Sequence, residues 1–200
     1  MLGQPFKTLF DGVVGASAVG MVRGVKLMDR RRTADFSAAV MRKVGPLFKE
    51  HRLGRENLRA AFPEKSDAEI EKILAGVWDN LGRLAIEFAH LDEFHPAGLG
   101  PLSPDVITYP PATQERGERM MKTGKATIGF AAHLANWELP ALGAKLMGIK
   151  SAVLFRRPNI APISNAIVKL RAPLMGELIP TGLDAPVKLA RLLQSGVVDH

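Results

Sequence analysis

A histidine and a glutamate separated by four residues are the pair in this sequence most suited to chemistry. They lie in ATIGFAAHLANWE, residues 126–138, where His133 follows an apolar run and Glu138 follows Asn136 and Trp137. An imidazole titrates near neutral pH and can act as a general base. A nearby carboxylate favours the protonated imidazole and holds its tautomer, and N–H groups at the start of a helix can stabilise an oxyanion. This combination suits acyl transfer to a hydroxyl group.

The spacing by itself is weakly specific, because Glu56 follows His51 at the same distance in HRLGRE. That second pair has no apolar run before it and lies among arginines, so we interpret it as surface. The alternative for His133 is a structural histidine whose ring nitrogens are hydrogen-bonded within an ordinary turn. An expected buried strand at 126–132 favours the catalytic interpretation, because ligands of open α/β sheets bind beyond the carboxyl ends of strands. The next helix is expected to begin directly after Asn136, its N-cap.

The first half of the chain is expected to be helical. Thr33 or Asp35 is the expected cap of a helix through 36–48, and a further helix is expected to stop at Pro63. The clearest helix follows at Ser66, which begins a capping box, and fades near residue 90. Its apolar residues recur at three- and four-residue steps and predict one buried face: Ile70, Ile73, Leu74, Val77, Leu81, Ala85 and Phe88, widened by Trp78 and Leu84.

Short strands and helices alternate after residue 105. Strands are expected at 106–109, 126–132, 151–155 and 177–181, and helices at 114–124, 137–147, 160–171 and 185–194. This order predicts an α/β fold, a mainly parallel or mixed sheet flanked by helices, with a helical N-terminal region. We expect a membrane-associated helical region at 1–95 and an α/β core at 104–200 within one structural domain. Residues 194–200 are expected to begin a further strand, which predicts truncation at the C-terminus.

The composition excludes several classes of site. The chain has 200 residues and no cysteine, so disulfides, thiolate metal sites and cysteine nucleophiles are excluded. It contains no G-x-S-x-G elbow, Walker A loop, H-E-x-x-H motif or G-x-G-x-x-G loop after a strand. We therefore expect neither a metal nor another cofactor.

The net charge of +7 favours anionic partners such as nucleic acid, anionic lipid or an acidic carrier protein. Nucleic acid is the weakest of these, because aromatic residues make up only 6% of the chain and no reading motif is present. Residues 12–22 carry no charge but are shorter than the ~20 apolar residues that a membrane span requires. This stretch is either a membrane-interface segment or the first helix of the core.

Four segments in the same order resemble the bacterial lipid A biosynthesis acyltransferases, which transfer lauroyl or myristoyl chains. HLANWE is similar to the family's H-x4-D/E motif. The others are RENLRAAFPEKSDAEI, WDNLGRLAIEF and FRRPNIAPISNAIVKLR. The chain departs from the family in having alanine before Asn136, phenylalanine at 155 where tyrosine is common, and a weaker apolar N-terminus.

The resemblance implies transfer of a fatty acyl chain from acyl carrier protein to a hydroxyl of a lipid A precursor. The reaction would take place on the anionic cytoplasmic face of the inner membrane. His133 would be the general base and Glu138 would orient it, with no covalent acyl-enzyme and no metal. The alternatives are a glycolipid or lysophospholipid acceptor, or an inactive truncated fragment that binds membranes.

The resemblance also implies the substrate-binding residues. Arginine binds phosphate well because its planar fork can contact two oxygens at once. Arg156, Arg157 and Arg171 would bind acceptor phosphates or developing negative charge. Asn136 and Trp137 would line the same site, with Asn136 as the helix cap and Trp137 as part of the wall of the site.

Overall fold

The computed structural model describes residues 4–96, 106–108, 110–146, 148–158 and 160–197. Contacts divide the chain into two compact units. A helical unit contains Val22–His90 and His133–Asn136, and an α/β unit contains Met1–Met21, Leu91–Ala132 and Trp137–His200. The predicted α/β class with a helical N-terminal region is confirmed.

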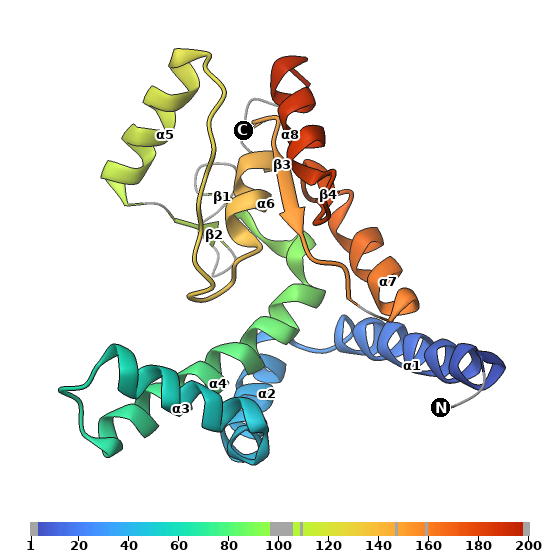
Figure 1. The fold of residues 1–200 in the computed structure, drawn as a ribbon, viewed down its shortest axis with the longest axis vertical. Coiled ribbons are helices and arrows are strands. Elements are labelled where there is room, and N and C mark those ends of the chain that lie inside the picture. The colour runs from blue at the N-terminus through green and yellow to red at the C-terminus, as the bar shows by residue number, and fades with distance from the viewer. Residues whose placement is uncertain (1–3, 97–105, 109, 147, 159, 198–200) are drawn as a thin grey trace. The chain divides into compact units, whose positions relative to one another are not determined.

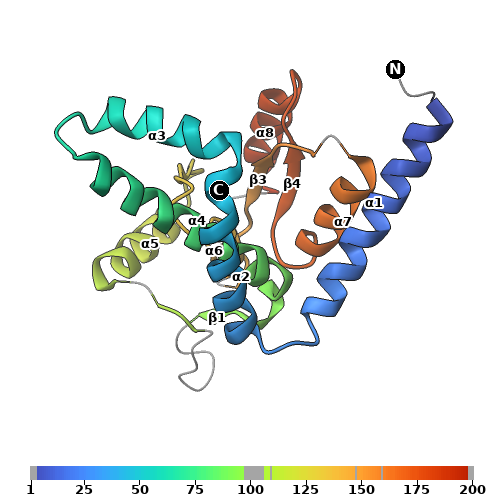
Figure 2. The same cartoon turned by 90° about the horizontal axis from the view of Figure 1, so that it is seen from below.

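The helical unit is built on one long helix against which two others pack. Its elements are α2 (Arg30–Val44), the 3-10 turn η1 (Gly45–Leu47), α3 (Lys49–Ala61) and α4 (Asp67–Ala89). Helices α3 and α4 form a hairpin, and α2 lies along α4 (Figures 1 and 2). Its buried apolar side chains come from α2 and α4: Ala34, Ala38, Ile70, Leu74, Trp78, Leu84, Ile86 and Ala89.

The start of α4 follows the predicted capping box. The Ser66 hydroxyl accepts from the Glu69 backbone N–H at 3.4 Å, and the Ser66 N–H donates to the Glu69 carboxylate at 2.9 Å. The predicted apolar face is only partly buried, since Val77 and Leu81 are exposed. The predicted cap of α2 was wrong: Asp29 caps this helix and accepts from the Arg32 N–H at 2.8 Å.

Gly82 lets α2 and α4 approach closely, and we expect Gly82→Ala to destabilise the protein. A Cβ at this position would lie 2.7 Å from the Ala38 Cα and 2.8 Å from the Ser37 carbonyl oxygen. Because both atoms belong to the backbone, a helix must shift, which costs about 1–3 kcal/mol. Urea unfolding followed by circular dichroism measures this loss.

The matched control for Gly82 is Gly76→Ala on the same helix, where a Cβ meets nothing within 4 Å. That change should stabilise the protein by up to about 1 kcal/mol, because alanine favours helix over glycine. Equal stability changes at the two positions would contradict this account of the α2–α4 contact.

Among its described residues, the α/β unit contains two small parallel sheets. One pairs β1 (His95–Pro96) with β2 (Val106–Ile107), and the other pairs β3 (Ala152–Phe155) with β4 (Glu177–Pro180). The other elements of this unit are α1 (Gln4–Val25, in this unit up to Met21), η2 (Leu91–Glu93), α5 (Pro111–Thr123), α6 (Leu139–Leu146), α7 (Ala161–Arg171) and α8 (Ala185–Gln194). Every helix predicted after residue 105 is therefore present, with bounds shifted by a few residues or fewer.

Helix α1 contains the uncharged stretch 12–22 and packs beside α7 (Figures 1 and 2). Gly15 is buried there, and a Cβ on it would overlap the Pro162 side chain at 2.1 Å. Elsewhere on α1, Phe10, Val13 and Met21 expose more than half of their surface. Across the part of the chain that is described, no helix is both long and apolar enough to cross a bilayer.

Two predicted strands are not found among the described residues. Residues 126–132 have no regular secondary structure, and Ile128 and Phe130 are 61% and 94% exposed. A strand requires a partner strand, and none of the described strands pairs with this segment. At the C-terminus, α8 continues to Gln194 and Gly196 takes a left-handed φ of +68°, a usual way to end a helix. Residues 198–200 of that predicted strand lie outside the described residues.

Candidate active site

The H-x4-E motif joins segment 125–135, which has no regular secondary structure, to helix α6. His133 is exposed at the end of the segment, whereas Glu138 is only 4% exposed. The Glu138 backbone carbonyl accepts the first hydrogen bond of α6 from the Leu142 N–H at 3.1 Å. Because His133 and Glu138 belong to different units, the pairing of their side chains stays a prediction.

Glu138 and Arg171 are brought together within the α/β unit. The Arg171 Nε donates to Glu138 Oε2 at 3.0 Å, and Nη2 donates to Oε1. The side chains are 4% and 15% exposed, so this ion pair is largely shielded from water. Two parallel charge-assisted hydrogen bonds of this kind fix both the distance and the relative orientation of the partners.

Arg171 also packs at the carboxyl end of β3. Its guanidinium carbon lies 5.9 Å from the ring centroid of Phe155, the last residue of this strand. Phe155 is buried, and its carbonyl accepts from the Thr181 N–H at 2.8 Å, beyond the end of β4. The Arg171–Glu138 pair therefore lies where α/β sheets usually bind ligands.

Asn136 has a different role from the predicted helix cap. Its side-chain amide donates to the Glu87 carboxylate at 2.9 Å, within the helical unit. Helix α6 begins only at Leu139, so the prediction that Asn136 caps it was wrong. Trp137 lies half-buried in the intervening turn. The bond between Asn136 and Glu87 ties residues 133–136 to the last turns of α4.

Arg156 and Arg157 directly follow β3, and both are exposed. Their position at the carboxyl end of a parallel strand is compatible with the predicted binding of phosphate.

No group of three or more His, Asp or Glu side chains among the described residues is arranged to hold a metal ion.

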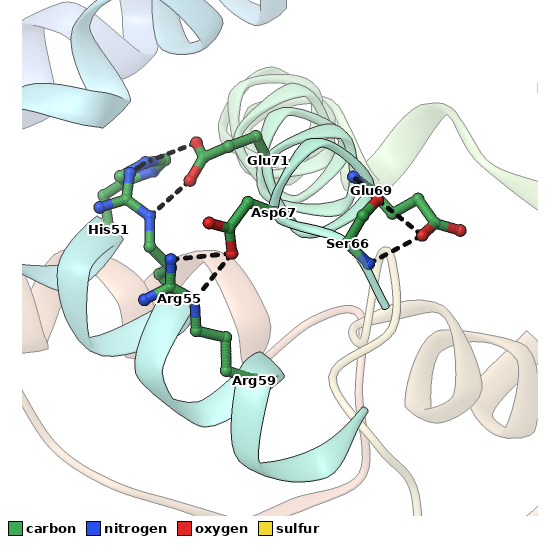
Figure 3. Close-up of polar contacts among 7 residues, drawn as sticks. All are labelled: His51, Arg55, Arg59, Ser66, Asp67, Glu69 and Glu71. Atoms are coloured by element: carbon green, nitrogen blue, oxygen red, sulfur yellow. Dashed lines mark hydrogen bonds and ion pairs between the residues drawn. The ribbon is translucent and has the colours of Figure 1, made fainter. Parts of the chain in front are cut away.

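The second H-x4-E match has a structural role. His51 is 5% exposed rather than on the surface, so our interpretation of it was wrong. The Trp78 indole N–H, which can only donate, donates to the His51 Nδ1 at 3.0 Å. The His51 Nε2 faces the Glu71 carboxylate at 3.1 Å. Arg55 points toward the same carboxylate (Figure 3), and its hydrogen bond lowers the pKa of Glu71. His51 thus joins α3 to α4.

Replacing His51 should reduce stability without changing the reaction. We expect His51→Leu to destabilise the protein by about 1–3 kcal/mol, because the buried Trp78 N–H loses its acceptor. The rate of the predicted acyl transfer, per folded molecule, should stay unchanged. Thermal unfolding and an activity assay on the same samples measure the two effects.

The matched control for His51 is Glu56→Gln, which removes the acid of the same motif match. Glu56 is exposed, and its ion pair with Arg52 spans 3.9 Å. Exposed pairs contribute about 0–1 kcal/mol, so little change is expected. A stable His51→Leu variant that has lost activity would contradict the assignment of His51 to the fold.

Sequence reasoning missed two contacts in this region. They are the bond between Asn136 and Glu87 and the bond between Arg171 and Glu138. These contacts join residues 49 and 33 positions apart in the chain. The only sign of these contacts in the sequence was a charged residue near the end of a helix, Glu87 in α4 and Arg171 in α7.

Comparison with known protein families finds a match. A family model described as bacterial lipid A biosynthesis acyltransferase matches residues 7–196. No curated protein and no solved structure matches the chain. The matched range includes the H-x4-E motif, Arg171 and both units of the fold.

Proposed function

This chain belongs to the bacterial lipid A biosynthesis acyltransferase family and is therefore an acyltransferase, and we propose that acyl carrier protein is its donor and that a hydroxyl of a lipid A precursor is its acceptor. The observation that carries the proposal is the H-x4-E motif inside a family match over residues 7–196.

His133 acts as the general base in the proposed reaction. Its imidazole takes the proton of the acceptor hydroxyl while the hydroxyl oxygen attacks the thioester carbonyl of the donor. The tetrahedral oxyanion then collapses, the carbon–sulfur bond breaks, and the imidazolium returns the proton to the leaving thiolate. Glu138 accepts a hydrogen bond from the other ring nitrogen and holds the tautomer that presents a free lone pair to the hydroxyl. The exposure of His133 supports this role, because both substrates must reach it.

The surroundings of the motif supply features that lipid substrates require. Ile128 and Phe130 expose apolar side chains on the segment before His133, where an acyl chain would find apolar surface. Arg156 and Arg157 bind the phosphates of the acceptor beyond the end of β3. Arg171 is also predicted to bind phosphate. Its guanidinium already bonds Glu138, and phosphate binding by this residue stays a prediction.

Charge and exposure support a reaction at an anionic membrane surface. The net charge of +7 attracts both anionic headgroups and an acidic carrier protein. Exposed apolar side chains on α1 precede Arg23 and Lys26, an arrangement that suits an interfacial helix. We propose that the protein acts on the cytoplasmic face of the inner membrane, as the family resemblance implies.

Mass spectrometry of the reaction product tests this function. The protein is incubated with acyl carrier protein charged with a saturated fatty acid, and with a tetra-acylated lipid A precursor. We expect one acyl group to be added to the precursor. Addition only to a lysophospholipid or another glycolipid offered in parallel would overturn the proposed acceptor, and no transfer to any acceptor would overturn the proposed function.

A further inference from the structure

Arg171, the last residue of α7, holds the acid of the H-x4-E motif by two hydrogen bonds. We propose that Arg171 is a positioning residue of the acyl transfer reaction, which fixes the orientation of Glu138 so that Glu138 can hold His133. The proposal rests on the function proposed above. It assigns Arg171 a role different from the binding of acceptor phosphate.

The geometry of the pair leaves the carboxylate little freedom. Nε and Nη2 of one guanidinium engage different oxygens of Glu138, so rotation of the carboxylate breaks at least one bond. An exposed arginine–glutamate pair would exchange readily with water and contribute little. Here the two side chains are 15% and 4% exposed, so few water molecules can compete for these bonds.

The guanidinium is itself held in place by the strand on which it packs. It lies over the ring of Phe155 at 5.9 Å, within the distance of a cation–π contact. Phe155 is 7% exposed and pairs with Pro180 in the parallel sheet of β3 and β4. The orientation of Glu138 is therefore set by α7 and β3, which are regular elements, rather than by the loop that carries the motif.

The Arg171 bonds leave Glu138 able to act on a histidine. An ionised carboxylate offers about four lone-pair sites on its two oxygens, and Arg171 occupies one on each oxygen. Another site can accept an N–H from an imidazole. The resulting order of arginine, glutamate and histidine follows the general design in which a base is oriented by a third group.

Steady-state kinetics separate positioning from phosphate binding. Loss of a phosphate contact made equally in ground and transition states raises KM, whereas loss of alignment lowers kcat. Arg171→Lys keeps a cation but cannot make the two parallel bonds. We expect its kcat to fall by about 10- to 100-fold, as for a catalytic group displaced by about an ångström. Its KM for the phosphorylated acceptor should change by less than about twofold.

Three further samples complete the experiment. Arg171→Ala with added guanidinium chloride should regain part of the lost kcat, because the small cation can occupy the same site. Lys169→Ala removes an exposed cation from the same helix and should match the wild type. The wild type is measured alongside with acyl carrier protein and a tetra-acylated lipid A precursor. If Arg171→Ala does not fold, the kcat and KM of Arg171→Lys alone decide between positioning and phosphate binding.

The outcomes distinguish this inference from the function on which it rests. A raised KM with unchanged kcat in Arg171→Lys would overturn positioning in favour of phosphate binding. Wild-type kinetics in Arg171→Lys would overturn both roles of Arg171 and leave the proposed function intact. A wild-type protein that transfers no acyl group would overturn the proposed function, and this inference with it.

Discussion

Replacing His133 by alanine is expected to lower the single-turnover rate of acyl transfer by about 10²- to 10⁴-fold, the usual contribution of a general base. The fold should be unaffected, because the His133 side chain is exposed and surface substitutions usually change stability by less than about 0.5 kcal/mol. Rapid-quench measurement of the acylated lipid gives the rate, and thermal unfolding checks the fold.

The His51 variant is the control for this result. His51→Leu should reduce stability and keep activity, whereas His133→Ala should keep stability and lose activity. Two histidines with the same motif spacing are thereby assigned opposite roles. A His133→Ala protein that transfers acyl groups at the wild-type rate would remove His133 from the mechanism.

Replacing Glu138 by alanine is expected to reduce both activity and stability. Glu138 is 4% exposed and is the carboxylate that bonds the Arg171 guanidinium, so its removal leaves a largely buried cation without this counter-charge. Breaking a buried ion pair by removing one partner costs about 3–5 kcal/mol, and residual exposure of Arg171 places this case at the low end. Loss of an orienting carboxylate should also slow transfer by at least about 10²-fold.

Two further variants separate the effects at Glu138. Glu138→Gln keeps the volume of the side chain and one acceptor oxygen, so it should be more stable than Glu138→Ala and still slow. Glu177→Ala removes an exposed acid at the start of β4 and should change neither property. Urea unfolding and single-turnover kinetics measure both. A Glu138→Ala protein as stable as the wild type would contradict the importance of its pair with Arg171.

The helices were predictable because their signals are local. The capping box of Ser66 and Glu69 lies within four residues, and α8 (Ala185–Gln194) has the predicted bounds. Local signals also failed where several residues compete for one role. Asp29 caps α2 in place of Thr33 or Asp35, and the Thr33 hydroxyl instead donates to the Asp29 carbonyl at 2.7 Å.

The features that were not predictable depend on residues far apart in the sequence. An apolar run at 126–132 looked like a strand, but strand formation depends on a distant partner. His51 looked exposed because its burial depends on Trp78, 27 residues later. The motif itself was predictable from spacing and resemblance, whereas the partner of Glu138 was not.

The central claim is that His133 and Glu138 act as one unit, and a double-mutant cycle on the single-turnover rate tests it most directly. His133→Ala, Glu138→Gln and the double variant are compared with the wild type, using acyl carrier protein as donor and a lipid A precursor as acceptor. If Glu138 acts only through His133, the double variant should be about as slow as His133→Ala, because residues that act as a unit are strongly non-additive. Losses that multiply in the double variant would show two independent contributions and contradict the claim.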